Sequence, residues 1–155
     1  MFSLAEIHPV IVHFPIVFFL SLVAFDTVTA VRGAPLAGRT STGNISTGLA
    51  LLAGLSAVVA FAFGDLAYDI ARSAGYNETQ LEIHQELGTW TAILLATWAV
   101  VRAYIWWRGA ALVNRVRLAV LGIEFGGAAL IITTAYFGGY LVYDLGVNVA
   151  RASVG

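Results

Sequence analysis

Long apolar stretches separated by short polar segments dominate this chain. Four of them, at about residues 9–31, 44–71, 84–107 and 115–143, each supply the roughly 20 apolar residues that a helix needs to cross a bilayer. The connections between them are short, which makes consecutive helices antiparallel neighbours. The pattern therefore predicts an all-α integral membrane protein, with residues 1–155 forming one antiparallel bundle of four transmembrane helices.

The connecting segments differ in the sign of their charge. Residues 32–43 carry two arginines and no acid, residues 108–117 carry three arginines and no acid, and residues 65–82 carry four acids against one arginine. The positive-inside rule places the two basic connections in the cytoplasm. We therefore expect both termini and the acidic connection on the outer, periplasmic side of a bacterial inner membrane.

The composition narrows the classes of function. Hydrophobic residues make up 59% of the chain and charged residues 11%, whereas a soluble domain carries about 25% charge. The net charge of −1 argues against nucleic-acid binding. Since there is no cysteine, iron–sulfur ligation, thiolate ligation of haem and covalent c-type haem are excluded.

All three histidines fall near one end of the predicted bundle. His8 and His13 lie where the first apolar segment begins, and His84 begins the third. Five residues advance a helix by about 500°, so the His8 and His13 rings point roughly 140° apart and are poorly placed to hold one metal together. Pro15 lacks an N–H and disturbs the first turn, which we expect to aim His13 inward.

Axial ligation of a haem iron is the leading hypothesis for these histidines. His13 and His84, on separate helices at similar depth, are the predicted ligands of one bis-histidine haem b. We expect His8 to be more exposed and to bond a propionate or serve a second site. The competing hypothesis is that all three are interfacial histidines bonded to backbone or water. A zinc or copper site is less favoured, because thiolates and an HExxH motif are absent.

Charged residues inside the spans are a second candidate site. Glu124 lies near the middle of the fourth span, and the hairpin of the last two spans brings it within reach of Arg102. An intramembrane ionisable group is a functional hypothesis by default. A structural ion pair between Arg102 and Glu124 and a proton-relay role are both open. Asp26, near the cytoplasmic end of the first span, is expected to pair with a nearby arginine such as Arg32 or Arg117.

Small residues indicate helix contacts. Gly122 and Gly126 form a GxxxG motif in the fourth span. Such spacing lets helix backbones approach closely in lipid. It also leaves room for a flat macrocycle, although close packing is the commoner explanation.

Three motifs carry a resemblance to a known family. They are His8-Pro9-x-x-Val12-His13-Phe14-Pro15-Ile16, His84-x-x-Leu87-Gly88 and Gly138-Gly139-x-Leu141-Val142-Tyr143-x-x-Gly146-Val147-x-Val149. They resemble the signature of a bacterial membrane family, the domain of unknown function 2231, over nearly the whole chain. The resemblance implies a small four-helix membrane domain. Relatives often occur beside, or fused to, Rieske or cytochrome c domains, which implies redox work with a soluble partner on a separate chain.

Two functions of different classes follow from these observations. The first is a haem b electron-transfer subunit that relays electrons between a periplasmic carrier and quinone, or a larger respiratory or photosynthetic complex. The second is a cofactor-free accessory subunit that anchors a membrane complex or assembles with copies of itself. A stand-alone enzyme is disfavoured, because no serine, histidine and acid converge at one depth.

Overall fold

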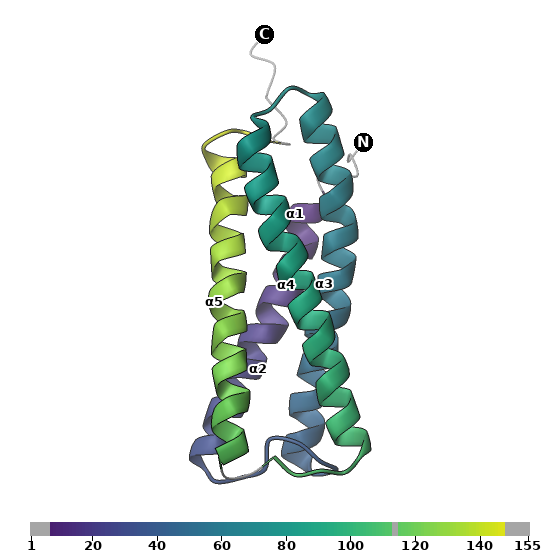
Figure 1. Ribbon diagram of the computed structural model, residues 1–155, viewed down its shortest axis with the longest axis vertical. Coiled ribbons are helices and arrows are strands. Elements are labelled where there is room, and N and C mark those ends of the chain that lie inside the picture. The colour runs from purple at the N-terminus through teal and green to yellow at the C-terminus, as the bar shows by residue number, and fades with distance from the viewer. Residues whose placement is uncertain (1–6, 113–114, 148–155) are drawn as a thin grey trace.

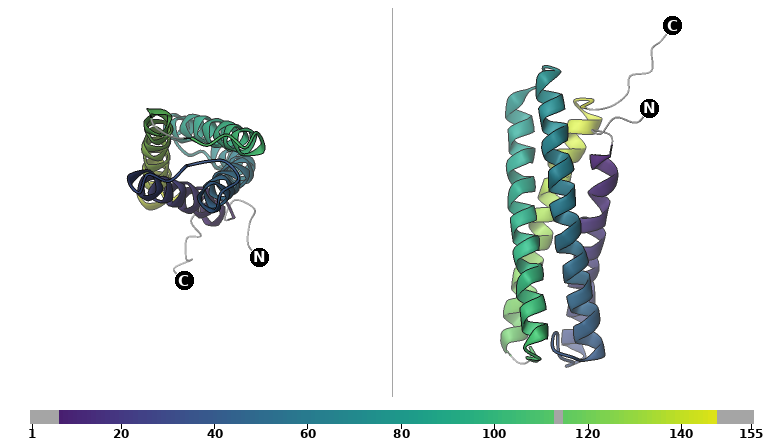
Figure 2. Two further views of the ribbon diagram at one scale, coloured as in Figure 1. Left: turned by 90° about the horizontal axis from the view of Figure 1, so that it is seen from below. Right: turned by 90° about the vertical axis from the view of Figure 1, so that its right-hand side faces the viewer.

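A computed structural model describes residues 7–112 and 115–147 of the chain, and this part is helical without strands (Figure 1). The helices are α1 (His8–Ile11), α2 (His13–Val31), α3 (Ser41–Ser73), α4 (Glu78–Trp107) and α5 (Arg115–Tyr143). Since α1 and α2 follow one another with a short break, the helices form four antiparallel rods at the corners of a square (Figure 2). All four rods are long and apolar enough to cross a membrane. The predicted all-α four-helix architecture is confirmed.

Two of the helices begin earlier than the apolar pattern predicts. The helix α4 starts at Glu78, where the Asn77 side chain accepts a hydrogen bond from Gln80 N at 3.4 Å. The Thr40 hydroxyl likewise accepts from Gly43 N at 3.1 Å ahead of α3. Such polar caps satisfy the free N–H groups of a first turn. The helices therefore extend past the apolar segments, and 33 residues of α3 span roughly 50 Å.

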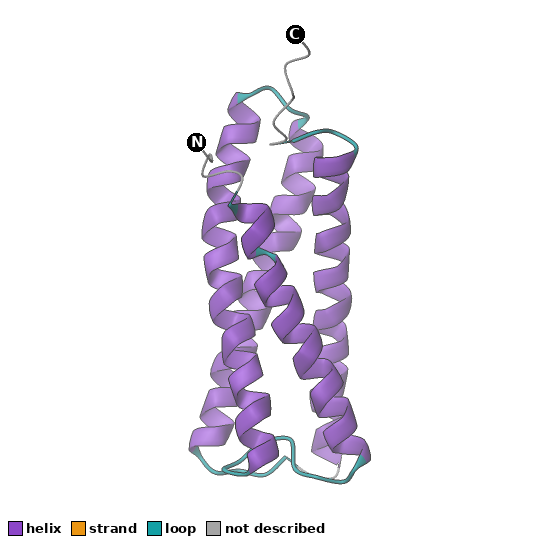
Figure 3. Cartoon of the chain, turned by 180° about the vertical axis from the view of Figure 1, so that it is seen from behind, coloured by secondary structure: helices purple, strands orange, loops and turns teal. Residues whose placement is uncertain are grey.

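The first rod is interrupted at Val12, between α1 and α2 (Figure 3). Pro15 has no N–H to donate to Ile11 O, and the next bond, from Ile16 N to Val12 O, is stretched to 3.5 Å. The predicted disturbance of the first turn is therefore present. It separates one turn that carries His8 from the straight helix that follows.

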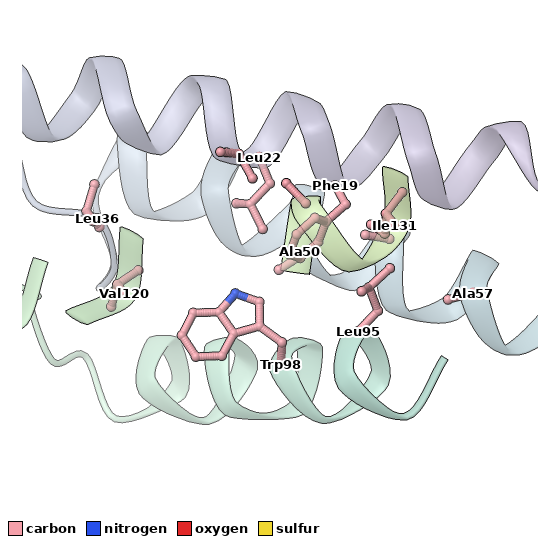
Figure 4. Close-up of a cluster of buried hydrophobic side chains, with 12 residues drawn as sticks. Phe19, Leu22, Leu36, Ala50, Ala57, Leu95, Trp98, Val120 and Ile131 are labelled. Atoms are coloured by element: carbon pink, nitrogen blue, oxygen red, sulfur yellow. The ribbon is translucent and has the colours of Figure 1, made fainter. Parts of the chain in front are cut away.

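The larger of two buried apolar clusters lies in the half of the bundle away from α1. Phe19 and Leu22 of α2 pack with Ala50 of α3 and with Leu95 and Trp98 of α4 (Figure 4). Small alanines on α3 allow the larger side chains of α2 and α4 to interdigitate. A smaller buried cluster lies toward the end where α1 begins and α5 ends, here called the histidine end, and consists of Ala71, Leu81, Leu141 and Val147.

The opposite end, here called the loop end, is closed by the connections after α2 and α4. The connection after α2 crosses this end of the bundle (Figure 2). Leu36 within it is fully buried, and its N–H donates to Leu112 O at 3.3 Å. The two loops are thereby tied together over the core.

Gly54 lies at a close approach of α3 to α4, and its replacement tests the packing of these two helices. A Cβ at this position would lie 2.6 Å from Ala99 Cβ and 2.9 Å from Leu95 O. We expect Gly54→Ala to cost about 1–3 kcal/mol through overpacking, measured as a lower midpoint in SDS-induced unfolding. Gly48→Ala on the same helix is the control, since its added methyl group has no neighbour within 4 Å in the part of the chain that the structure describes. Equal losses in both variants would contradict the close approach.

Candidate functional site

Two histidines from different helices face each other at the histidine end. His8 begins α1, and His84 lies in the second turn of α4. Their imidazole centroids are 6.2 Å apart, and the ring planes are inclined by 73°. Residues separated by 76 positions in the chain therefore form one pair of polar rings in a largely apolar bundle.

A glycine lies against each of these rings. A Cβ on Gly64 of α3 would lie 2.9 Å from His8 Cε1, and one on Gly138 of α5 would lie 2.8 Å from His84 Cε1. Real Cβ atoms do not approach this closely, so a larger residue at either position would displace the ring. All four rods thus contribute to the site, two with a histidine and two with a glycine.

The hydrogen bonds of the two rings differ. His8 Nδ1 lies 3.0 Å from the carbonyl oxygen of Ala60. A carbonyl only accepts, so Nδ1 carries the proton, and Nε2 of the neutral ring keeps a free lone pair. His84 Nδ1 is buried and has no hydrogen-bond partner among the described residues. A buried polar atom of this kind is rare in native structures and marks His84 as a candidate ligand.

A cavity of about 350 Å³ opens around the pair. Its lining is mostly apolar and includes side chains from α1 to α5, among them His8, His13, Tyr68, His84 and Thr134. Cofactor sites are commonly apolar cavities of about 300–1,000 Å³ with a few polar groups. The cavity has the size and lining of such a site.

The two histidines of the first rod do not lie as the sequence predicts. His13 lines the cavity but is exposed, whereas His8 is half-buried and faces His84. The expectation that His8 is the more exposed of the two is therefore wrong, and the break at Val12 does not turn His13 inward. The first span is apolar around its whole circumference, so no amphipathic stripe in the sequence indicates which histidine points to the interior.

A second polar cluster lies near the loop end, around Arg102. Its Nη1 donates to Asp26 Oδ2 at 2.8 Å and to Glu124 Oε1 at 3.0 Å. Its Nη2 donates to Leu36 O at 2.6 Å and to the hydroxyl of Ser46. All three charged side chains are fully buried. We call Arg102, Asp26 and Glu124 the Arg102 cluster.

The partner expected for Asp26 is wrong. Asp26 bonds Arg102 across the bundle, while Arg117 donates to Ala30 O at 3.3 Å. Among residues 7–112 and 115–147, neither Arg32 nor Arg117 forms an ion pair. Inside a span, the Arg102 guanidinium has no water to compensate its charge, so it pairs with the carboxylate of Asp26 across the bundle. The hydrogen bond from Arg102 to Ser46 was not predicted. Serine is common at helix contacts in lipid, so its presence in a span does not by itself indicate a charged partner.

The GxxxG motif of α5 points away from the bundle. Gly122 and Gly126 are exposed, and no atom of the described residues lies within 4 Å of a Cβ added to either. The neighbouring Gly127 makes the contact instead, since its added Cβ would lie 2.7 Å from Phe19 Cζ. The expectation that Gly122 and Gly126 mark a helix contact is wrong within this chain.

Comparisons with known proteins bear on the whole chain. No curated protein and no solved structure matches it. A family model described as predicted membrane protein (DUF2231) matches residues 5–151, a range that contains all three motifs of the sequence. The last residue of the third motif, Val149, lies outside the described residues. Because the match covers nearly the entire chain, this protein belongs to the family of predicted membrane proteins DUF2231.

Proposed function

We propose that this protein is a membrane-embedded electron-transfer subunit that binds one haem b at the histidine end, with His8 and His84 as its axial ligands. The observation that carries the proposal is the 6.2 Å separation of the two ring centroids. An imidazole nitrogen bonds a first-row metal at about 2.0 Å, so two rings at this spacing would be near enough for both to hold the haem iron.

The surroundings of the two rings support the same assignment. The Ala60 carbonyl bonded to His8 Nδ1 holds that ring and makes its Nε2 a better ligand. Gly64 and Gly138 admit the rings at distances that no other residue allows. His13, exposed at the cavity, is available to a propionate. The proposed ligand on the first rod is therefore His8, in place of His13, which the sequence predicts.

The donor set favours haem over a bare metal ion. No group of three or more histidine, cysteine, aspartate or glutamate side chains gathers at one point in residues 7–112 and 115–147. A bare zinc ion takes at least three protein ligands, whereas haem iron needs two axial ones. Haem, when bound, supplies one-electron chemistry, and the protein supplies ligands, orientation and a low-dielectric setting.

A haem at the histidine end requires electron partners. The basic loop end faces the cytoplasm under the positive-inside rule, so the histidine end faces the periplasm of a bacterial inner membrane. A single haem near one face does not carry electrons through about 30 Å of hydrocarbon. The proposed partners are therefore a periplasmic cytochrome c or Rieske-type carrier on one side, and quinone or a subunit of a respiratory or photosynthetic complex on the other.

An absorption spectrum tests the proposal directly. The full chain is purified from a haem-competent host and measured oxidised and after reduction with dithionite. We expect a Soret band and sharp reduced α and β bands, which are typical of low-spin, six-coordinate iron. A colourless protein that also fails to bind added hemin would contradict the proposal.

The outward face of α5 favours a second candidate function, a cofactor-free accessory subunit. Gly122 and Gly126 are exposed on the surface of the bundle, and small residues in lipid permit close approach of another helix. The histidines would then serve as interface hydrogen-bonding groups, as His8 does with Ala60. This function predicts a colourless protein that co-purifies in mild detergent with a stoichiometric membrane partner or a second copy.

A further inference from the structure

The Arg102 cluster is unbalanced in charge. Two carboxylates, Asp26 and Glu124, meet one guanidinium, and all three side chains are fully buried. With every group ionised the cluster would carry a charge of −1 in a bilayer, where an uncompensated charge is strongly disfavoured. The cluster therefore needs one further positive charge.

No other side chain in the described part of the chain supplies that charge. Among the described residues, the groups that face the cluster are the Leu36 carbonyl, the Ser46 hydroxyl from α3 and the Trp98 indole from α4. None of these is titratable near neutral pH. Arg117 of α5 is directed to Ala30 O instead. The missing charge must come from a bound cation, of which the smallest is a proton.

The hydrogen-bond pattern of the cluster has a place for a proton. Both N–H bonds of Arg102 Nη1 are used, one for each carboxylate. The second oxygen of each acid, Asp26 Oδ1 and Glu124 Oε2, is buried and has no partner among the described residues. Asp26 Oδ2 and Glu124 Oε1 bond the same nitrogen at 2.8 and 3.0 Å, and of two like-charged acids held this near to one another one favours the protonated form.

The position of the cluster indicates the side from which a proton enters. Arg102 lies five residues before the end of α4, about 7–8 Å along the helix axis. Asp26 lies at the same distance from the end of α2. The Leu36 loop, which accepts a hydrogen bond from Arg102, covers the cluster at the loop end. Water at this end is therefore the nearest source.

We propose that Asp26 and Glu124 share one proton at neutral pH, so that the Arg102 cluster is an electrically neutral, intramembrane proton-binding site loaded from the loop end. The site is separate from the histidine cavity and does not depend on whether haem binds there. Removing either acid leaves one carboxylate with one guanidinium, and this pair is neutral without a proton.

Infrared spectroscopy of the full chain in lipid nanodiscs tests this site. At neutral pH we expect a carbonyl-stretch band of a protonated carboxylic acid, which shifts on deuteration and on labelling of aspartate or glutamate with ¹³C. The band should vanish in Asp26→Asn and also in Glu124→Gln. It should persist in the control Asp65→Asn, which alters an exposed acid of α3. Absence of the band from the wild type, or its persistence in either cluster variant, would overturn the proposal.

The pH dependence of folding gives a second measurement. The unfolded acids have released their protons at pH 7, so folding takes up one proton. The folding equilibrium constant of the wild type should therefore fall about tenfold more per pH unit than that of Asp26→Asn. The histidines are the same in both proteins and cancel in the comparison. Parallel slopes would overturn the proposal.

A metal cation is the competing occupant, and a salt exchange distinguishes it. Carboxylate oxygens also bind hard cations. Replacing choline chloride with sodium chloride at constant ionic strength should leave the unfolding midpoint of the wild type unchanged. If sodium raises the unfolding midpoint of the wild type but not that of Asp26→Asn, sodium occupies the Arg102 cluster, and the assignment to a proton is overturned.

Discussion

Arg102→Met is expected to remove about 3–5 kcal/mol of folding free energy, the usual cost of breaking a buried charge pair. The substitution keeps the length of the side chain but leaves Asp26 and Glu124 buried without a cation. It also removes the donors to Leu36 O and Ser46, which tie the loop end to the core. With a typical stability of about 5–15 kcal/mol, we expect a large fall in the SDS unfolding midpoint and in the yield of folded protein.

Two control variants test whether the loss of folding free energy in Arg102→Met comes from the burial of the charges or from the length of the ion-pair bond. Arg72→Gln breaks an ion pair with Glu78 of 3.0 Å, but those side chains are 58% and 59% exposed. Water compensates there, so the cost should stay below about 1 kcal/mol. The triple variant with Arg102→Met, Asp26→Asn and Glu124→Gln should recover much of the loss, because no charge remains unpaired. Similar midpoints for Arg102→Met and Arg72→Gln would show that the cluster does not stabilise the bundle.

The second large effect concerns the histidines. His84→Ala and His8→Ala are each expected to abolish six-coordinate haem, seen as loss of the sharp reduced α and β bands. Each removes one of two rings that face each other across 6.2 Å. His13→Ala should keep these bands, because His13 is exposed and lies outside the pair. Absorption spectra of the three variants, purified side by side with hemin supplied, provide the measurement.

Chemical rescue sharpens this comparison. Free imidazole should restore the low-spin spectrum of His84→Ala, since the cavity that lost a ring can take one from solution. If His13→Ala loses the bands and His8→Ala retains them, the pairing of His13 with His84 is the right one. The first turn must then rearrange about the break at Val12 when haem binds.

The spans of this protein are predictable from its sequence because lipid imposes one demand on each of them. A helix in hydrocarbon must be apolar over about 20 residues, and four such segments are evident. The caps at Thr40 and Asn77 lie outside those segments, in polar residues that the apolar pattern does not weigh. Helix number and order were therefore predictable, whereas the starts of α3 and α4 were not.

The two sites are predictable from the sequence only in part, because an apolar span does not show which of its sides faces the interior. The gathering of His8, His13 and His84 at one end follows from topology alone. Which ring faces inward depends on the rotation of the first rod about its axis, and a segment apolar on all sides carries no mark of that rotation. The pairing of Arg102 with Glu124 is predictable because both lie in the hairpin of the last two spans. The pairing with Asp26 is not, because Asp26 contacts Arg102 from the other side of the bundle.

The Arg102 cluster also has a consequence for biogenesis. Asp26 enters the membrane 76 residues before Arg102, and Glu124 follows Arg102 by 22. A lone charge at the centre of an inserting helix costs about 2.5–3.5 kcal/mol, and one nearer the helix end, as Asp26 and Arg102 are, costs less. Neither the first hairpin nor the second satisfies the three side chains by itself. The cluster is therefore complete only when the last helix has been inserted. A chain truncated before α5 keeps the neutral pair of Asp26 and Arg102, whereas a chain truncated before α4 keeps the Asp26 carboxylate in the bilayer without a guanidinium.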